Sequence, residues 1–320
     1  MSRLYISTYH YTRDLRHSRY PKIKGLDVAL FKQQLDFLEQ NFSVVRMEDV
    51  MEAADGGKEL PDDALLLTFD DGYIDNFTVA FPLLMEHGMQ GSFFIPGKTF
   101  AENTLLDVNK LHFVLACAPI DRLVADVKDL ILGGGTAYPE LPSCDEIYAA
   151  YAKRNRFDDR DTVFCKRVLQ TALPEALRNE LSSVLFEKYV GVAESDFSRE
   201  LYMNRDQIRL MRQSGMFIGL HGYDHYWLAN LSEEQMHADI GRALEVMDEF
   251  IDRDSWVMNY PYGNHSEAVV SYIKEKGCVL GLTTDARVAD LSSDDRYRLP
   301  RLDCNDFPPK SENYKLEKPV

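Results

Sequence analysis

The chain has 320 residues, of which 45% are hydrophobic and 28% charged, and its 52 acidic and 36 basic residues give a formal net charge of −16. This composition is ordinary for a soluble globular protein, and the length suffices for one barrel-sized domain with an insertion. The acidity argues against nucleic acid as a partner, because no basic patch is present to neutralise phosphates, and it disfavours an anionic membrane surface. No run approaches the roughly 20 apolar residues that a membrane span needs.

The N-terminus and the cysteines predict a cytoplasmic protein. Residues 1–10 do not resemble a signal peptide, because their apolar stretch is short and interrupted by polar residues. The cysteines form no Cys-x-x-Cys pair, which favours reduced thiols packed as small apolar residues. There are five of them: Cys117, Cys144, Cys165, Cys278 and Cys304.

Short apolar runs with strand composition alternate with amphipathic helical patterns along much of the chain. In the first helical pattern, 28–41, the apolar side chains share one face and Asp27 is a candidate N-cap. Two further helices are expected at 232–250 and 269–275. Strands are expected at 4–9, 43–46, 64–70, 90–95, 216–221, 255–260 and 278–283. Alternating strands and helices predict a parallel α/β fold.

The strand at 64–70 ends on two adjacent carboxylates and a glycine, Asp70, Asp71 and Gly72. Neighbouring residues on a strand point to opposite sides, so one acid can hold a metal while the other accepts a proton. Taken alone, this end fits a turn equally well, since Asp-Gly is a common turn pair.

The strand at 216–221 ends in His221-Gly222-Tyr223-Asp224-His225. Two histidines four residues apart face the same point if the segment turns helically after the strand. Two imidazoles and a carboxylate form a common three-ligand set for a catalytic divalent ion. By itself, this spacing fits surface histidines equally well.

The strand at 255–260 breaks at Pro261 into Tyr262 and Gly263. Proline ends the strand, and such a turn can aim backbone N–H groups at a developing oxyanion. Without the other two segments, an aromatic turn packing the rim of a barrel is the simpler interpretation. All three segments follow strands, which is where the catalytic rim of a (β/α) barrel lies.

Together, Thr68-Phe69-Asp70-Asp71-Gly72, His221-x-x-x-His225 and Tyr260-Pro261-Tyr262-Gly263 resemble the polysaccharide deacetylase family, the NodB-homology group of carbohydrate esterase family four. The resemblance covers about 1–100 and 200–305, and implies a distorted (β/α) barrel with about seven strands. It also implies that Asp70 is the general base, that a divalent metal, usually zinc, is bound, and that the Tyr262 backbone N–H stabilises the oxyanion. The metal ligands that it implies are Asp71, His221 and His225.

The chain departs from the family pattern at several positions. In the second motif, Gly222 replaces the usual Ser or Thr, and Tyr226 replaces the usual Pro. In the family these two positions support the metal ligands and do not bind the metal. Asn259 stands where the family has an arginine that orients the base, and Asn cannot make a charge-assisted bond. Arg301, at a later strand end, is a candidate replacement, and a surface arginine is an equal alternative.

The family's late Leu-x-His motif, which supplies the general acid, is absent. After residue 225 the sequence has only His237, within a helical pattern, and His265, after the Pro-Tyr-Gly turn. His10, at the end of the first predicted strand, is the better candidate. It resembles the Tyr-His opening of the poly-N-acetylglucosamine deacetylase subgroup, and we assign it as general acid or substrate-binding residue.

Residues 101–205 interrupt the strand–helix alternation. The ranges 105–132 and 145–189 have helical patterns, with a Gly- and Pro-rich loop between them. We interpret the chain as one domain of 1–320 that carries a mostly helical insertion at about 101–205. The insertion is a lid, a dimer surface in a homo-oligomer, or a packing appendage. The polar tail, 308–320, is expected to be frayed or packed on a neighbour.

Three functions compete at this stage. The leading one is a metal-dependent hydrolase that removes N-acetyl groups from an amino sugar or oligosaccharide substrate. If the protein is cytoplasmic, that substrate is a precursor, such as a nucleotide-linked or lipid-linked sugar, or a soluble monosaccharide. The second keeps the metal but acts on a cyclic amide or ureide. The third is a non-catalytic carbohydrate-binding relative, in which Asn259 and the missing late histidine record lost chemistry.

Overall fold

The computed structural model of the chain describes residues 3–134, 138–155 and 158–316. The chain forms two compact units. The first contains Met1–Asp14, Gly25–Asn103 and Ser198–Val320, and the second contains Leu15–Lys24 and Thr104–Phe197. Among the described residues, no helix combines the length and the apolar character that crossing a membrane requires.

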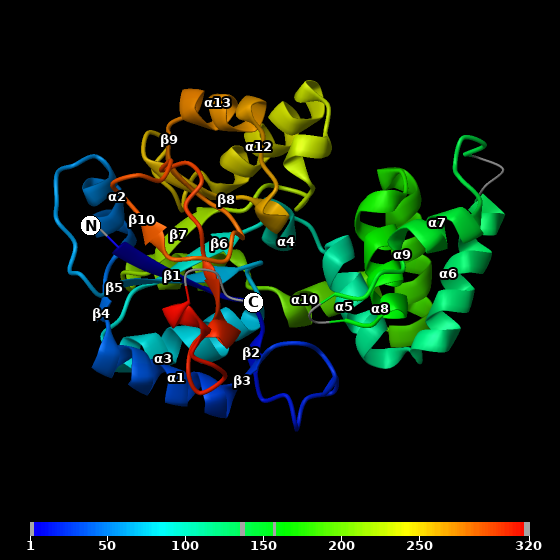
Figure 1. Cartoon of the computed structure of the whole chain (residues 1–320), viewed down its shortest axis with the longest axis horizontal. Coiled ribbons are helices and arrows are strands. Elements are labelled where there is room, and N and C mark those ends of the chain that lie inside the picture. Colours follow the sequence, from blue (N-terminus) through cyan, green and yellow to red (C-terminus); the bar gives the residue numbers. More distant parts are fainter. Residues whose placement is uncertain (1–2, 135–137, 156–157, 317–320) are drawn as a thin grey trace. The chain divides into compact units, whose positions relative to one another are not determined.

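The first unit is built on a curled sheet with the strand order β10-β1-β5-β6-β7-β8-β9 (Figure 1). From β1 to β9 the neighbouring strands are all parallel. Two further strands pair at its side, β11 with β1 and β4 with β5. The bounds are β1 (Arg3–Tyr9), β4 (Ser43–Val44), β5 (Ala64–Asp70), β6 (Gly91–Ile95), β7 (Phe217–Leu220), β8 (Trp256–Asn259), β9 (Cys278–Leu282), β10 (Ala289–Asp290) and β11 (Leu302–Asp303).

The segment after β9 links the two ends of the sheet. Leu299 forms a parallel bridge with Leu282 of β9. Three residues later, Leu302 in β11 pairs with Ser7 of β1. The sheet is therefore a curled half-barrel, and the prediction of a distorted (β/α) barrel with about seven strands is confirmed.

The central strands of the sheet are buried and are held together by aromatic side chains that stack from strand to strand. Every residue of β5 is buried. The Phe69 ring stacks on Tyr9 of β1 at 4.9 Å and on Phe93 of β6 at 4.7 Å between ring centroids. Cross-strand pairs of this kind stabilise a sheet and fix its register. The end of β5 is thereby held in place, which matters because two carboxylates follow there.

Helices follow most strands and bury one face each. In α1 the buried face is Phe31, Gln34, Leu35 and Leu38, and the Asp27 side chain accepts a hydrogen bond from Ala29 N as N-cap. The helices of the first unit are α1 (Val28–Asn41), α2 (Met47–Ala54), α3 (Phe81–Glu86), α4 (Gly97–Ala101), α11 (Arg205–Gln213), α12 (Glu233–Met247) and α13 (Glu267–Glu275). A two-stranded sheet pairs β2 (Thr12–Arg13) with β3 (Leu26–Asp27), and a π-helical segment spans Asn76–Ala80.

The regular elements of the second unit are all helical in its described residues, and Leu15–Lys24 forms turns and bends. Phe197 packs against Phe113 of α5 at 4.6 Å and against Phe186 of α9 at 5.4 Å between ring centroids. Its helices, green in Figure 1, are α5 (Asp107–Cys117), α6 (Ile120–Gly134), α7 (Cys144–Tyr151), α8 (Arg160–Arg167) and α9 (Glu175–Val190), and α10 (Glu194–Leu201) leads back to the first unit. That this unit is an insertion into a single domain at 101–205 stays a prediction.

The tail, 308–320, was predicted to be frayed or packed on a neighbour, and its described residues are packed and not frayed. The Tyr314 ring stacks on Phe307 at 5.3 Å and contacts Phe42 at 5.6 Å between ring centroids. These aromatic contacts tie the tail to the first unit itself, as far as Leu316. Residues 317–320 lie outside the described part of the chain.

Candidate metal centre and its surroundings

The two carboxylates separate at the end of β5 because the backbone leaves the strand between them. Asp70 is the last strand residue, whereas Asp71 has a φ of 73° and Gly72 a φ of 69°, both in the left-handed region. A side chain at Gly72 would meet Ile95 Cγ2 at 2.7 Å, so only glycine fits there. The divergence of the two acids thus comes from this turn and not from the alternation of a strand.

The two histidines converge by a different route from the predicted one. Residues 221–225 form a loop and not a helical turn, with left-handed φ values of 68° at Gly222 and 59° at His225. The loop is held by Asp239 of α12, whose carboxylate accepts hydrogen bonds from the backbone N–H of Tyr223 at 2.9 Å and of Asp224 at 2.8 Å. The expectation of a helical turn is wrong, because these bonds to Asp239 replace helical ones.

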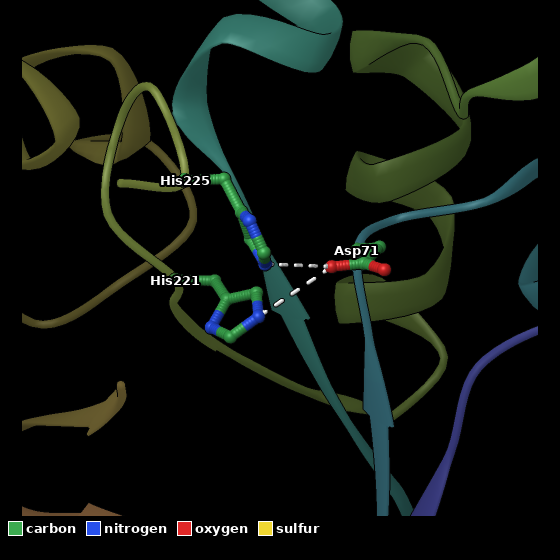
Figure 2. Close-up of side chains that lie close together, drawn as sticks. All are labelled: Asp71, His221 and His225. Carbon is green, nitrogen blue, oxygen red and sulfur yellow. Dashed lines mark ion pairs between the residues drawn. The ribbon is translucent and has the colours of Figure 1, made fainter. Parts of the chain in front are cut away.

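The structure brings Asp71, His221 and His225 together at the rim of the sheet (Figure 2). Asp71 Oδ1 lies 3.5 Å from His221 Nε2 and 3.3 Å from His225 Nε2. All three residues are buried. Ligand atoms that share a tetrahedral zinc ion at 2.0–2.2 Å are about 3.4 Å apart, so the separations from Asp71 match a shared divalent ion.

Hydrogen bonding orients the ligand atoms of this group. His221 Nδ1 is 2.6 Å from the backbone oxygen of Asn259, so Nδ1 carries the proton and Nε2 keeps its lone pair for a metal. Among the described residues, neither Asp71 Oδ1 nor His225 Nδ1 has a hydrogen-bond partner, although both are buried. An unpartnered carboxylate oxygen between two imidazole nitrogens fits a cation site.

The protonation states also fit a metal. Burial raises the pKa of Asp71, but His221 and His225 outweigh it and hold the pKa well below its ordinary value. Burial lowers the pKa of His225. An ionised carboxylate and a neutral imidazole are the forms in which these side chains bind metals.

Arg301 lies directly on Asp70. Its guanidinium donates to both carboxylate oxygens, with Nη1–Oδ1 and Nη2–Oδ2 distances of 2.9 Å each, and Nε donates to the Thr283 backbone oxygen at 2.8 Å. Burial raises the pKa of Asp70, but the charge and hydrogen bonds of Arg301, together with His221 and His10, outweigh burial, and the pKa falls to about 2. Of the two interpretations of Arg301, the geometry thus favours the partner of Asp70, since its side chain is only 1% exposed.

The Asn259 side chain does not take part in this pairing. It is fully buried, and neither its amide nitrogen nor its amide oxygen has a partner among the described residues. Asn259 contributes to the site through its backbone oxygen, which accepts a hydrogen bond from His221 Nδ1.

His10 and Tyr262 flank the group. His10 Nε2 is 3.9 Å from Asp70 Oδ2, and its side chain is 44% exposed, so substrate can reach it. Tyr262 has a φ of 58° inside the short 3-10 helix Pro261–Gly263. Its ring stacks on Trp227 at 4.4 Å and meets the edge of His225 at 4.7 Å between centroids.

Backbone strain in the described residues gathers at this site. Three non-glycine residues have a positive φ, namely Asp71, His225 and Tyr262. Such conformations cost of order 1–3 kcal/mol each and persist only where the surroundings enforce them. All three are candidate site residues, so the fold retains strain where it positions the proposed chemistry.

Sequence reasoning missed two residues that hold the ligands. Asp239 gave no signal, because it lies in the helical pattern after the loop, where an acidic residue is ordinary. Tyr73 donates its hydroxyl to Asp71 Oδ2 at 2.6 Å. Its place two residues after Asp71 was the signal that could have identified it.

A second group that could hold a metal is formed by Asp36 and Glu39 of α1 with His87. His87 Nδ1 is 2.9 Å from Glu39 Oε2, and the side chains of Asp36 and Glu39 are 65% and 54% exposed. An exposed, already paired group of this kind is typical of a surface ion pair.

Comparison with known proteins agrees with the geometry. The family model described as polysaccharide deacetylase matches residues 57–125 and 181–281. A Bacillus subtilis protein named as a polysaccharide deacetylase, YxkH, is 24% identical over 88 residues, which are 28% of this chain and 32% of that protein. The poly-beta-1,6-N-acetyl-D-glucosamine N-deacetylase of Escherichia coli is 36% identical over 64 residues, which are 20% of this chain and 10% of that protein. The matches therefore span a third or less of these relatives.

Solved structures share the fold over nearly the whole chain. The deacetylase PplD of Streptococcus pyogenes, solved in complex with acetate, has a TM-score of 0.59 at 14% identity and covers 99% of this chain and 98% of its own. IcaB from Ammonifex degensii has a TM-score of 0.56 at 19% identity, and the match covers 98% of this chain and 97% of IcaB.

Proposed function

This chain belongs to the polysaccharide deacetylase family, and on that premise we propose that it hydrolyses the N-acetyl group of an amino sugar with the help of a divalent metal ion. The observation that carries the proposal is the convergence of Asp71 Oδ1 with the Nε2 atoms of His221 and His225. These three residues would hold the ion, and zinc suits two imidazoles and one carboxylate with open positions for water and substrate.

A bound divalent ion would supply Lewis acidity, which polarises an amide carbonyl and makes water a stronger acid. In the proposed reaction, Asp70 accepts the proton of the attacking water. Its pKa of about 2 keeps it ionised at neutral pH but makes it a weak base, so it relies on water of raised acidity. Arg301 holds both oxygens of Asp70 and so fixes the direction from which the proton is taken.

The remaining roles concern the departing amine and the oxyanion. We assign His10 as the acid that protonates the leaving amine, supported by its exposure and its distance of 3.9 Å from Asp70. We assign the backbone N–H of Tyr262 as a hydrogen-bond donor to the amide oxygen, on which negative charge develops. One such donor typically stabilises the transition state by roughly 3 kcal/mol. The products are acetate and a free amino sugar.

The substrate class that we propose is a glycan or oligosaccharide of N-acetylated hexosamines. Its support is the family match together with the name of the Escherichia coli relative, a poly-beta-1,6-N-acetyl-D-glucosamine N-deacetylase. That match covers only a fifth of this chain, so the linkage and the length of the sugar are part of the proposal.

The test is acetate release from N-acetylglucosamine oligomers by the zinc-loaded and the chelator-treated protein. We expect turnover only with metal, and a loss of about 10²- to 10⁴-fold in Asp70→Asn, which removes the base and leaves the ligands. Metal content is measured in both proteins as the control. Turnover of a cyclic imide in place of the sugar, or sugar binding without turnover at any metal loading, would contradict the proposal and favour the two other functions considered.

We also propose that the protein works in a reducing compartment. All five cysteines are free, and all except Cys117 are buried. The measurement is a thiol titration of denatured protein isolated without reductant from its own cells. Five titrating thiols are expected, and any disulfide would contradict the proposal.

A further inference from the structure

The two oxygens of Asp71 have different surroundings. Oδ1 faces His221 and His225 and has no hydrogen-bond partner among the described residues. Oδ2 instead accepts the hydroxyl proton of Tyr73 at 2.6 Å. One oxygen is therefore free for a cation while the other is occupied by the protein itself.

A second tyrosine supports the first. The Tyr11 ring stacks on Tyr73 at 4.0 Å between centroids, with the planes 20° apart, and the two phenols are hydrogen-bonded to each other. Because the single hydroxyl proton of Tyr73 goes to Asp71, Tyr11 is the donor in this second bond. Bonds in such a chain polarise one another, so Tyr11 strengthens the bond that Tyr73 makes.

The position of Tyr73 is set by contacts within the first unit. Its backbone forms an antiparallel bridge with Tyr202, and the neighbouring Gly72 oxygen accepts a hydrogen bond from Met203 N at 2.9 Å. The rings of Tyr73 and Tyr202 are stacked at 6.3 Å between centroids. Tyr73 is fully buried and Tyr11 is 2% exposed, so water does not compete for these bonds.

We propose that Tyr73, supported by Tyr11, is a positioning residue that makes Asp71 bind metal through Oδ1 alone. A carboxylate can bind an ion through one oxygen or through two. A phenol on Oδ2 prevents the second mode, which leaves coordination positions for water and the amide oxygen. The inference rests on the proposed function, because it concerns the same metal ligands.

The experiment compares three Tyr→Phe variants that each remove one buried hydroxyl. Tyr73→Phe removes the bond to Asp71, and Tyr11→Phe removes only the bond behind it. Tyr9→Phe is the matched control, because its hydroxyl donates to Gln34 Oε1 at 2.7 Å and touches no proposed ligand. For each full-length protein, Zn²⁺ affinity is measured by competition with a chelator, and the visible spectrum is recorded with Co²⁺ in place of Zn²⁺.

We expect Tyr73→Phe to bind Zn²⁺ about 10- to 100-fold more weakly than the wild type, which is the usual effect of losing a partner behind a metal ligand. Its Co²⁺ spectrum should change, because Asp71 gains a second coordinating oxygen. Tyr11→Phe should lose less affinity, and Tyr9→Phe should match the wild type in both measurements. The rise in unfolding temperature on adding Zn²⁺ is compared within each variant, so that a general loss of stability does not count as weaker binding.

Equal affinity and an equal Co²⁺ spectrum in Tyr73→Phe and wild type would overturn the inference and leave the proposed function standing. A wild type that binds no Zn²⁺ would overturn the proposed metal site itself, which is a separate result. If Tyr73→Phe does not fold, Tyr11→Phe decides. Weaker binding than in Tyr9→Phe then supports the inference, and equal binding overturns it.

Discussion

The first unit carries the whole net charge of −16, whereas the second contains 15 basic and 15 acidic residues and is neutral. In the second unit, charges are paired: Asp158 lies 2.5 Å from Lys24 and 2.7 Å from Lys166, and Lys110 contacts Asp107 and Glu194. The described non-glycine residues with a positive φ all belong to the first unit.

This difference distinguishes the first unit, which contains the proposed site, from the helical second unit. At the rim of the curled sheet, the first unit keeps strained backbone and unpartnered buried polar atoms close together, which is costly unless it serves a function. The helical unit pairs charges such as Asp158 and Lys110 locally, and its unpartnered buried atoms, Arg178 Nε and Ser182 Oγ, come without a left-handed non-glycine residue in its described part. Substitutions in the two units should therefore have opposite signatures, strong on chemistry in the first and confined to stability in the second.

The largest effect is expected from Asp71→Ala. The variant removes the carboxylate that lies between His221 and His225, so bound metal and acetate release should both fall to the level of the chelator-treated wild type. The measurement is metal content by elemental analysis alongside the acetate assay. A variant that keeps a full equivalent of metal would show that the ion binds elsewhere.

Arg301→Met should have the next largest effect. It leaves the Asp70 carboxylate buried without a cation, which typically costs about 3–5 kcal/mol of unfolding free energy. Urea unfolding of the metal-free protein measures this loss. The double variant Asp70→Asn/Arg301→Met is the control and should recover much of it, because no charge is then left alone. Equal instability in the single and double variants would mean that Arg301 acts through packing.

The pH dependence of stability gives a smaller effect on the same pair. The pKa of Asp70 is lowered to about 2 in the folded protein, because Arg301, together with His221 and His10, outweighs burial. In an unfolded chain the pKa is about 3.9. The carboxylate thus contributes about 2–3 kcal/mol above a pH of about 4, and loses it as the pH falls through about 2. The measurement is the difference in unfolding free energy between the metal-free wild type and Asp70→Asn, which should shrink over this range. Parallel curves for the two proteins would contradict the lowered pKa.

The smallest effect on the site is expected from Asp158→Asn in the second unit. It weakens two charge-assisted bonds and should lower the unfolding free energy by about 1–3 kcal/mol. Zn²⁺ affinity and acetate release should stay unchanged. A clear loss of either would break the separation between the two units.

The sequence predicted the parts of the fold that local patterns determine. Strand β5 was predicted with its observed bounds, because an unbroken apolar run between turn residues has few alternatives. Strands β2, β3, β10 and β11 were missed, since two residues show no period. The strand ends indicated that a carboxylate and the two histidines lie at one rim, and the family resemblance singled out Asp71 among the two acids. Arg301 was considered because Asn259 replaces the family arginine.

The missed features of the site depend on the backbone conformation of the turns and on a contact with the helix that follows the loop. The left-handed φ of His225 belongs to a loop that Asp239 holds through backbone N–H groups, and no pattern within 221–225 reveals that partner. The hydroxyl of Tyr73 reaches Asp71 only because Asp71 itself leaves the strand. The spacing made Tyr73 a possible partner of Asp71, but the conformation that brings the two side chains together is visible only in the structure.

The most direct test of the central claim is a crystal structure of the protein with zinc, recorded with anomalous scattering at the zinc edge. The account predicts one strong peak within about 2.3 Å of Asp71 Oδ1 and of the Nε2 atoms of His221 and His225. A fully occupied ion elsewhere, with these three atoms free of metal, would contradict it.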